Sequence, residues 1–363
     1  MKIVEGEWNI TRVDTYPRIV AIELTTRCNL SCVHCFRNTM TDPRDDMPKE
    51  LAFRVLDNAK DINIERVVFT GFGEPLVHPY IEDILTYAKK KGLYVVLNTN
   101  GTLLDKHLET VFNTVDTLIV SVDISEDSVY REIRRGGSLA SIVEAIKKLV
   151  DMKRRYRSSR PVIEFWTTLT RLNVDGISGL VDLCRKLGVL RLTISNYIPT
   201  KVNDELSCLD DPRCIERAKQ NISEIAKTLF DSTPQLSYVG HRIRSDRRCP
   251  YISNLATFVR FDGYVTPCMH YAHSWRFVFN NVERAIRPVI FGSIARQRLE
   301  EIWSNDRYAM FRFNTYFMLY PSCYTCDLEP YCSYTYDNEF DCLGKSPTCA
   351  HCPYAHRLAI CPL

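Results

Sequence analysis

Short apolar runs rich in β-branched residues alternate with longer amphipathic stretches over the first 200 residues of the chain. The short runs predict strands, and the stretches, whose apolar residues recur every three or four positions, predict helices. Strands are expected at Arg18–Thr25, Arg66–Thr70, Tyr94–Asn98, Thr117–Val122, Val162–Leu169 and Leu190–Asn196. Helices are expected at Lys49–Lys60, Tyr80–Lys91, Ser138–Arg155 and Val174–Leu187.

This alternation predicts an α/β fold in which parallel strands are joined by right-handed helical crossovers. Six such units are too few for a closed eight-fold barrel, so we expect a partial (β/α)6 barrel of the TIM type. Three regions are expected: the barrel in residues 1–200, a linker in residues 201–248 and a small domain in residues 249–363. The last region holds nine cysteines with weak periodicity, which is typical of a domain held together by metal.

The chain of 363 residues is 45% hydrophobic and 25% charged, with a formal net charge of only +3. These values are ordinary for a globular protein and give no reason to expect a nucleic-acid partner. The first residues lack a signal-peptide pattern and no window approaches a membrane span, so we expect a cytoplasmic protein with no membrane partner. Disulfides are rare in a reducing cytoplasm, and the fifteen cysteines therefore favour metal ligation.

The first clustered cysteines, Cys28, Cys32 and Cys35, follow the first predicted strand with the spacing Cys-x3-Cys-x2-Cys. Thiolate sulfur is a preferred ligand of zinc and of iron–sulfur clusters. A closed structural site needs four protein ligands, whereas three thiolates on a four-iron cluster leave one iron free to bind another molecule. A zinc site completed by His34 is the alternative.

Three further polar motifs follow the next predicted strands: Gly71-Phe72-Gly73-Glu74-Pro75, Asn98-Thr99-Asn100-Gly101 and Ser121-Val122-Asp123. Each motif alone is a weak turn signal. The carboxyl ends of barrel strands form the face where barrel enzymes build their sites, so the motifs are expected to meet there. A glycine allows a ligand to approach the backbone, Glu74 can accept a hydrogen bond from an ammonium group, and Ser121 and Asp123 share one face.

The order and spacing of these motifs resemble the radical S-adenosylmethionine (SAM) superfamily across about residues 18–200. The resemblance implies that Cys28, Cys32 and Cys35 hold a 4Fe-4S cluster whose open iron binds the amino and carboxylate groups of SAM. It also implies that the reduced cluster cleaves SAM to methionine and a 5′-deoxyadenosyl radical, which removes a hydrogen atom from the substrate.

By the same resemblance, the residues expected to contact SAM are Gly73, Glu74, Ser121, Asp123 and Arg134. Glu74 is expected to bind the ammonium group, Ser121 the carboxylate or ribose, and Asp123 the ribose hydroxyls. Arg134 is expected to bind the carboxylate, with Arg135 an equal candidate. The adenine pocket is expected to include Leu192 or Ile194.

The nine later cysteines are Cys249, Cys268, Cys323, Cys326, Cys332, Cys342, Cys349, Cys352 and Cys361. The pair Asp262-Gly263 between two apolar runs predicts a hairpin turn that brings Cys268 beside Cys249. Nine thiols can supply two clusters of four cysteines each, with one thiol to spare. Zinc is the alternative metal, because Cys-x2-Cys pairs are common in zinc sites.

This region resembles the SPASM extension of radical SAM maturases, which carries two auxiliary 4Fe-4S clusters. The resemblance implies that Cys323, Cys326 and Cys332 share one cluster, completed by Cys349 or Cys352. It implies that Cys249, Cys268 and Cys342 share the other, with Cys361 as the fourth ligand. The usual SPASM pattern has a cysteine four positions after Cys332, where this chain has Tyr336.

The segment DCLGKSPTCAHCPYAHRLAICPL resembles a SPASM subgroup, the maturases that accompany tungsten-containing aldehyde ferredoxin oxidoreductases. This resemblance implies a substrate protein or its cofactor, a tungstopterin oxidoreductase as partner and a ferredoxin-type electron donor. One alternative is a maturase of a ribosomal peptide or other protein. A second is a non-catalytic metal-binding or electron-transfer protein, and a weaker one is a pterin-forming enzyme acting on a nucleotide.

Overall fold

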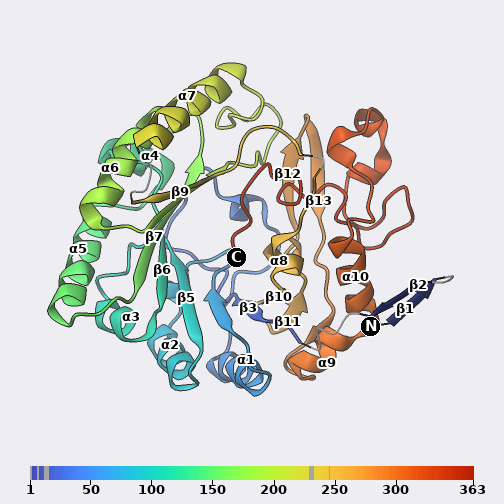
Figure 1. Cartoon of the computed structure of the whole chain (residues 1–363), viewed down its shortest axis with the longest axis horizontal. Helices are drawn as coiled ribbons and strands as arrows, with labels where there is room; N and C mark the ends of the chain where they lie inside the picture. The colour runs from blue at the N-terminus through green and yellow to red at the C-terminus, as the bar shows by residue number, and fades with distance from the viewer. Residues whose placement is uncertain (1, 6–7, 12–15, 229–232, 245) are drawn as a thin grey trace.

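A computed structural model describes residues 2–5, 8–11, 16–228, 233–244 and 246–363 of the chain. One sheet has ten strands in the order β14-β11-β10-β3-β4-β5-β6-β7-β8-β9, and its middle is parallel (Figure 1). The six middle strands are β3 (Ile19–Ile22), β4 (Arg66–Phe69), β5 (Tyr94–Thr99), β6 (Thr117–Ser121), β7 (Val162–Leu169) and β8 (Arg191–Asn196). They confirm the predicted strands and the partial barrel.

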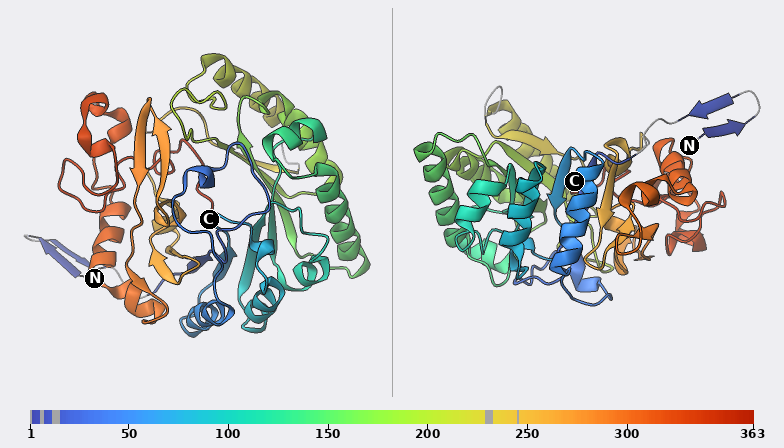
Figure 2. Two further views of the ribbon diagram at one scale, coloured as in Figure 1. Left: turned by 180° about the vertical axis from the view of Figure 1, so that it is seen from behind. Right: turned by 90° about the horizontal axis from the view of Figure 1, so that it is seen from below.

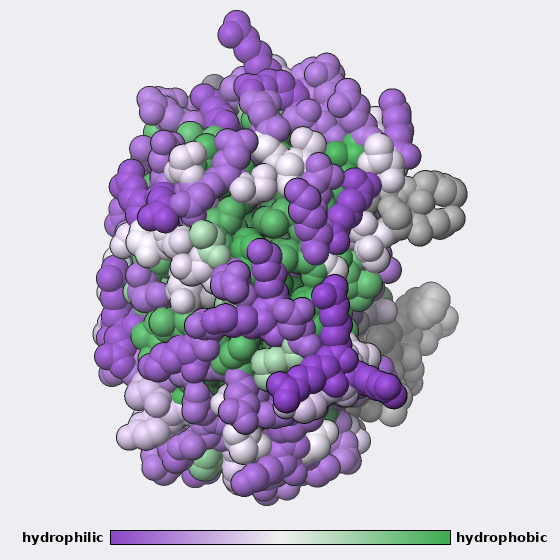
Figure 3. All heavy atoms as spheres, turned by 90° about the vertical axis from the view of Figure 1, so that its left-hand side faces the viewer, coloured by the Kyte–Doolittle hydropathy of each residue, from purple (hydrophilic) through white to green (hydrophobic). Residues whose placement is uncertain are grey.

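Helices cover the outer side of these strands (Figures 1 and 2). They are α1 (Lys49–Asp61), α2 (Ile81–Lys90), α3 (Leu108–Thr114), α4 (Asp127–Ile133), α5 (Leu139–Arg155) and α6 (Ile177–Leu187). In α5 an apolar stripe that includes Ile142, Ile146 and Leu149 is buried, as expected for a helix with one face on a sheet. Figure 3 shows the left-hand side of the molecule in Figure 1, and this outer face is mostly hydrophilic.

The structure differs from the expected linker at residues 201–248. Helix α7 (Pro212–Thr228) packs against α6, and strand β9 (Gln235–Tyr238) pairs in parallel with β8. This region therefore adds a further helix and strand to the barrel. The sequence of this strand, Gln-Leu-Ser-Tyr, has no run of β-branched residues and none of its residues is fully buried, which is why the sequence pattern did not predict it.

The C-terminal region continues the same sheet beyond β3. Strand β10 (Ala256–Val259) pairs in parallel with β3, and β11 (Tyr264–Thr266) pairs with β10 through the predicted hairpin. Gly263 in the turn has a φ of 80°, a left-handed conformation that favours glycine. The two-residue strand β14 (Gly292–Ser293) ends the sheet.

The remaining C-terminal elements lie outside this sheet and are short. They are α8 (Pro250–Ser253), the ladder of β12 (Trp275–Phe279) with β13 (Val282–Ile286), α9 (Leu299–Ser304) and α10 (Asp306–Tyr316). A separate hairpin pairs β1 (Lys2–Glu5) with β2 (Trp8–Thr11). No helix in the described ranges has the length and apolar character needed to cross a bilayer.

A buried ionic contact joins the barrel to the C-terminal region. Glu23, directly after β3, and His273 are both fully buried, with 2.7 Å between Glu23 Oε2 and His273 Nε2. The other ring nitrogen of His273, Nδ1, lies 2.9 Å from Oδ2 of Asp42. Burial alone would lower the pKa of His273, but the hydrogen bonds to Asp42 and Glu23 raise it to about 9. The imidazole is therefore charged at neutral pH.

Raising the pH should remove the stability that this charged imidazole contributes. The folded pKa of about 9 lies above the roughly 6.5 of an unfolded histidine. The contribution is complete below about pH 6.5 and is lost as the pH rises through about 9, a loss of at most about 3 kcal/mol by proton linkage. Anaerobic urea denaturation at about pH 6.5 and at about pH 9 gives the two free energies of unfolding whose difference measures this loss.

The His273→Gln variant is the control, because glutamine keeps polar atoms at this position but does not titrate. The free energy of unfolding of this variant should change less over the same pH range than that of the wild-type chain. An equal change in both proteins would show that other groups control the pH dependence.

Candidate active site

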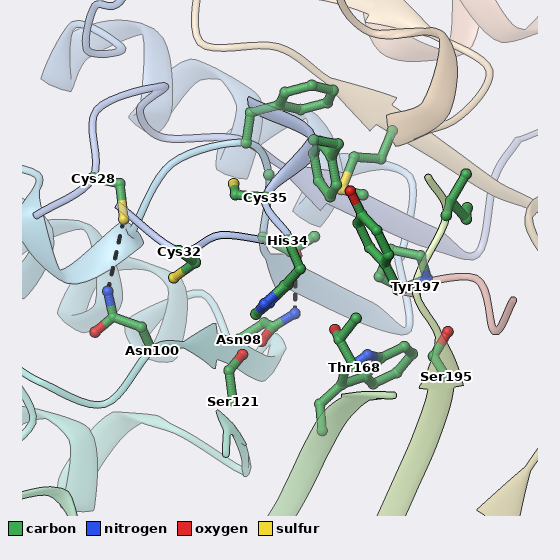
Figure 4. A pocket seen from close by; sticks show the side chains of 18 of the residues that line it. Cys28, Cys32, His34, Cys35, Asn98, Asn100, Ser121, Thr168, Ser195 and Tyr197 are labelled. Atoms are coloured by element: carbon green, nitrogen blue, oxygen red, sulfur yellow. Dashed lines mark hydrogen bonds between the residues drawn. The ribbon is translucent and has the colours of Figure 1, made fainter. Parts of the chain in front are cut away.

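Three cysteines lie together at the carboxyl ends of the barrel strands. Cys28, Cys32 and Cys35 occupy the loop between β3 and η1 (Phe36–Thr39), and all three line one cavity. Figure 4 shows them along a single loop at one side of this cavity. Cys28 Sγ accepts two N–H donors, the Leu30 amide at 3.4 Å and Asn100 Nδ2 at 3.8 Å. The second contact ties the cysteine loop to the motif that follows β5.

The surroundings of these thiols fit a bound metal cluster. Burial raises the pKa of Cys28 and raises that of Cys32 to about 12, so both thiols are protonated at neutral pH without a metal. Thiolate ligation of a metal would deprotonate them. The positive charge of Arg134 lowers the pKa of Cys32 and so partly offsets the effect of burial. In the same wall, the buried Nδ1 of His34 has no hydrogen-bond partner among the described residues.

Gly73 lies on the cavity wall at a point where no side chain fits. A Cβ on Gly73 would lie 2.3 Å from the carbonyl oxygen of Thr25 and 2.4 Å from that of Arg27. The absence of a side chain therefore lets this loop pack against the chain that leads to Cys28. The amide of Glu74 donates to the same Arg27 carbonyl at 2.8 Å.

Glu74 connects two of the predicted motifs. Its buried carboxylate accepts hydrogen bonds from the Asn100 amide and the Thr99 Oγ1, both at 2.6 Å, and from the Leu76 amide at 3.0 Å. Burial raises the pKa of Glu74, and these three donors act in the opposite direction. Glu74 also lines the cavity. Its contact with the SAM ammonium stays a prediction.

Ser121 lines the cavity at the end of β6, whereas Asp123 does not. Both carboxylate oxygens of Asp123 are occupied, Oδ2 by Arg134 Nε at 2.6 Å and Oδ1 by the Thr168 amide at 2.8 Å. The carboxylate of Asp123 orients Arg134, and its expected contact with ribose stays a prediction. Arg134 lines the cavity, while its equal candidate Arg135 is exposed and lies outside the wall.

The ends of β7 and β8 supply wall residues that were not predicted from the sequence. They are Trp166, Thr168, Ser195, Asn196 and Tyr197. Leu192 and Ile194, expected at the adenine pocket, are fully buried and outside the wall, because alternate residues of a strand face opposite sides. Ser121 was predicted because it is a polar residue at the end of a strand. The same signal is present in Thr168, Ser195 and Asn196, so it could have identified them.

The nine C-terminal thiols divide into two groups. Burial, opposed by the charge of Arg284 and helped by the thiol neighbours Cys332, Cys342 and Cys326, raises the pKa of Cys323 to about 12. Burial also raises the pKa values of Cys349 and Cys361. These two thiols share a second set of thiol neighbours, which are Cys249, Cys268 and Cys352. One group therefore has four thiols and the other has five.

This division differs from the expected ligand sets. Cys342 lies with Cys323 rather than with Cys268, and the pair Cys349 and Cys352 lies with Cys268. The hydroxyl of Tyr271 donates to the Thr348 carbonyl at 2.7 Å, which anchors the start of this pair beside Cys268. Such a contact between distant parts of the chain cannot be deduced from cysteine spacing.

The remaining cysteines lie outside both groups. Cys184 is fully buried on α6. Cys208 and Cys214 form a disulfide. Within the described part of the chain, no three His, Cys, Asp or Glu side chains are placed so as to hold a single metal ion.

Known proteins with similar sequences define the class of this chain. Residues 22–163 match the radical SAM superfamily, and residues 249–327 match the SPASM iron-sulfur cluster-binding domain. The chain is therefore a radical SAM enzyme with a SPASM domain, and its cofactors are 4Fe-4S clusters and SAM.

A particular relative narrows this assignment. The chain is 30% identical to the tungsten-containing aldehyde ferredoxin oxidoreductase cofactor-modifying protein of Pyrococcus furiosus, over 94% of this chain and 96% of that protein. The chain belongs to the family of that protein. An AdoMet-dependent heme synthase of Methanosarcina barkeri is 28% identical over 80% of this chain and 82% of its own.

Solved structures share the fold at lower identity. Streptococcus suis SuiB bound to its precursor peptide SuiA matches with a TM-score of 0.63 at 17% identity, covering 88% of this chain and 71% of SuiB. The protein anSMEcpe with bound AdoMet matches with a TM-score of 0.61 at 15% identity, covering 86% of this chain and 84% of its own. These likenesses support the barrel and its C-terminal extension.

Replacing Glu74 with alanine should weaken SAM binding by roughly 1.5–3 kcal/mol, the scale of a hydrogen bond to a charged group. Equilibrium dialysis of labelled SAM against the anaerobically reconstituted protein measures the change. Glu50→Ala, which removes an exposed carboxylate from the first turn of α1, is the control and should bind SAM normally. Unchanged affinity in a folded Glu74→Ala protein would reject the proposed contact.

Proposed function

We propose that Cys28, Cys32 and Cys35 hold the SAM-binding cluster, and that the enzyme uses it to modify a tungsten oxidoreductase or its cofactor. The observation that carries this proposal is that the three thiols share one cavity with Glu74 and Arg134. Three protein ligands leave one iron of a four-iron cluster open. A carboxylate and a guanidinium that line the same cavity would suit the two charged groups of an amino acid.

When bound, the reduced cluster supplies the electron that cleaves SAM into methionine and a 5′-deoxyadenosyl radical. The residues of the chain bind and orient SAM. Arg134, held by Asp123, is proposed to face the methionyl carboxylate, Glu74 the ammonium and Ser121 the carboxylate or ribose. Trp166 and Trp275 in the wall would exclude water from the reacting groups.

The two C-terminal thiol groups are proposed to hold the auxiliary clusters. Cys323, Cys326, Cys332 and Cys342 form one ligand set, and four of the five thiols Cys249, Cys268, Cys349, Cys352 and Cys361 form the other. Positive charge lies close to both sets, because Arg284 lowers the pKa of Cys323 and Arg247 interacts with Cys323 and Cys349. Such charges stabilise thiolate ligands and the anionic clusters that they hold.

The substrate proposal rests on the relative from Pyrococcus furiosus, whose name describes modification of the cofactor of a tungsten oxidoreductase. Cleavage of each SAM consumes one electron, so a small iron–sulfur protein of the ferredoxin type is proposed as the donor. Maturation of a ribosomal peptide is the second candidate. A short peptide encoded beside this gene, and altered in mass by the enzyme, would favour that candidate.

Cys32→Ala should remove about four irons per chain, the content of one four-iron cluster, and all 5′-deoxyadenosine formation. The C-terminal iron should remain, because none of its proposed ligands is changed. Iron analysis and chromatography of the reaction products measure both effects after anaerobic reconstitution.

Cys184→Ala is the matched control, since it removes a buried thiol that belongs to no proposed cluster. This variant should keep its iron and its SAM cleavage, with some loss of stability. SAM cleavage by Cys32→Ala at the wild-type rate would show that the cluster lies elsewhere.

A further inference from the structure

The four-thiol group of the C-terminal region consists of Cys323, Cys326, Cys332 and Cys342. The first three lie in the segment 323–335, which contains the short helices η5 (Cys323–Thr325), η6 (Glu329–Tyr331) and η7 (Ser333–Thr335). Strand β13 lies beside this part of the chain, and its Arg284 is fully buried (Figure 1). Arginine is rarely buried without a partner, so the contacts of this side chain indicate its role.

The guanidinium of Arg284 contacts the segment on both sides of Cys332. Nη1 donates to the Thr335 carbonyl at 2.7 Å, and Nη2 forms an ion pair with Glu329. Glu329 lies three residues before Cys332, and Thr335 lies three residues after it. Arg284 therefore holds the turn that carries Cys332 from both ends.

Two further contacts fix Arg284 beside this segment. Its Cζ atom lies 5.5 Å from the centre of the ring of Tyr324, the residue that follows Cys323. The backbone amide of Ala285 donates to the Tyr336 carbonyl at 2.7 Å. Both partners in each contact belong to the chain, so the protein itself holds the guanidinium in place.

One donor of this guanidinium is left over. The Nε of Arg284 is buried and has no hydrogen-bond partner within the described ranges. Leaving a buried donor of a charged group unpaired is costly. Burial raises the pKa of the Cys323 thiol and the positive charge of Arg284 lowers it, so the two groups lie within electrostatic reach. The sulfur atoms of a cluster held here would supply the missing acceptor.

We infer that Arg284 donates a hydrogen bond from Nε to the cluster of the four-thiol group and thereby raises the reduction potential of that cluster. This inference rests on the proposed function, because it requires a cluster at these thiols. Reduction adds a negative charge to the cluster. A cation that also donates to the sulfur atoms stabilises the reduced form more than the oxidised form. Arg284 is thus a positioning residue that also sets the potential.

A redox titration followed by electron paramagnetic resonance measures the potential of each cluster in the anaerobically reconstituted protein. Cys323→Ala identifies the signal of the four-thiol group, because it removes a proposed ligand of that cluster alone. If Cys323→Ala alters no cluster signal, the proposed ligand set is wrong, and this part of the proposed function fails independently of Arg284.

The main variant combines Arg284→Met with Glu329→Gln. Arg284→Met alone would leave the buried charge of Glu329 without a partner, which destabilises the chain. The double variant removes the donor while the summed charge of the pair stays at zero. The reduction equilibrium of this cluster should shift at least about tenfold toward the oxidised form, which is about 59 mV for a one-electron couple. The other clusters should keep their potentials.

Glu329→Gln alone should act in the opposite direction, because it keeps Arg284 and removes the neighbouring negative charge. The potential of the same cluster should therefore rise. If the double variant loses this cluster, Glu329→Gln decides, and an unchanged or lower potential contradicts the inference.

Arg276→Met combined with Glu283→Gln is the matched control. It makes the same two replacements in an exposed ion pair of the β12–β13 ladder, with 3.0 Å between Arg276 Nη1 and Glu283 Oε1. Solvent screens exposed charges, so the control should keep the wild-type potential. The inference is overturned if the double variant at Arg284 and Glu329, with full iron content, keeps the wild-type potential, or if the control shifts it as much.

Discussion

The buried contact between Glu23 and His273 connects the two halves of this enzyme at the strand on which both depend. Strand β3 leads directly into the cysteine loop and also pairs with β10 of the C-terminal region. Glu23, at the end of β3, binds His273 and accepts a hydrogen bond from the Phe72 amide at 2.8 Å. One carboxylate therefore fixes the position of the C-terminal region and of the glycine-rich loop at the SAM site.

The electrostatic surroundings of the cysteines determine whether their thiols ionise and so whether they can ligate a metal. A buried thiol resists ionisation, and burial raises the pKa of one thiol or more in each group, among them Cys32, Cys323 and Cys361. Iron ions bound by the thiolates would supply the positive charge that offsets this penalty, with help from Arg134 and Arg284. Cluster binding and the correct folding of these loops are thus coupled, as in other domains built around metal.

The barrel could be predicted from the sequence because its strands are rich in β-branched residues and its helices have one apolar face. The motifs at the strand ends could be predicted because topology brings the carboxyl ends of parallel strands together. The contact of Asp123 with Arg134 and the grouping of Cys349 and Cys352 with Cys268 could not, since the second depends on the position of Thr348 beside Tyr271. Strand β9 was missed because its residues, Gln-Leu-Ser-Tyr, form no apolar run and lie at an edge of the sheet.

The central claim is that three thiolates hold a cluster with one iron open to SAM. Electron paramagnetic resonance of the reduced, reconstituted protein, recorded with and without SAM, tests this claim most directly. The account predicts that SAM changes the signal of one cluster and leaves the signals of the auxiliary clusters as they are. Spectra that are identical with and without SAM, in a protein with a full complement of iron, would contradict it.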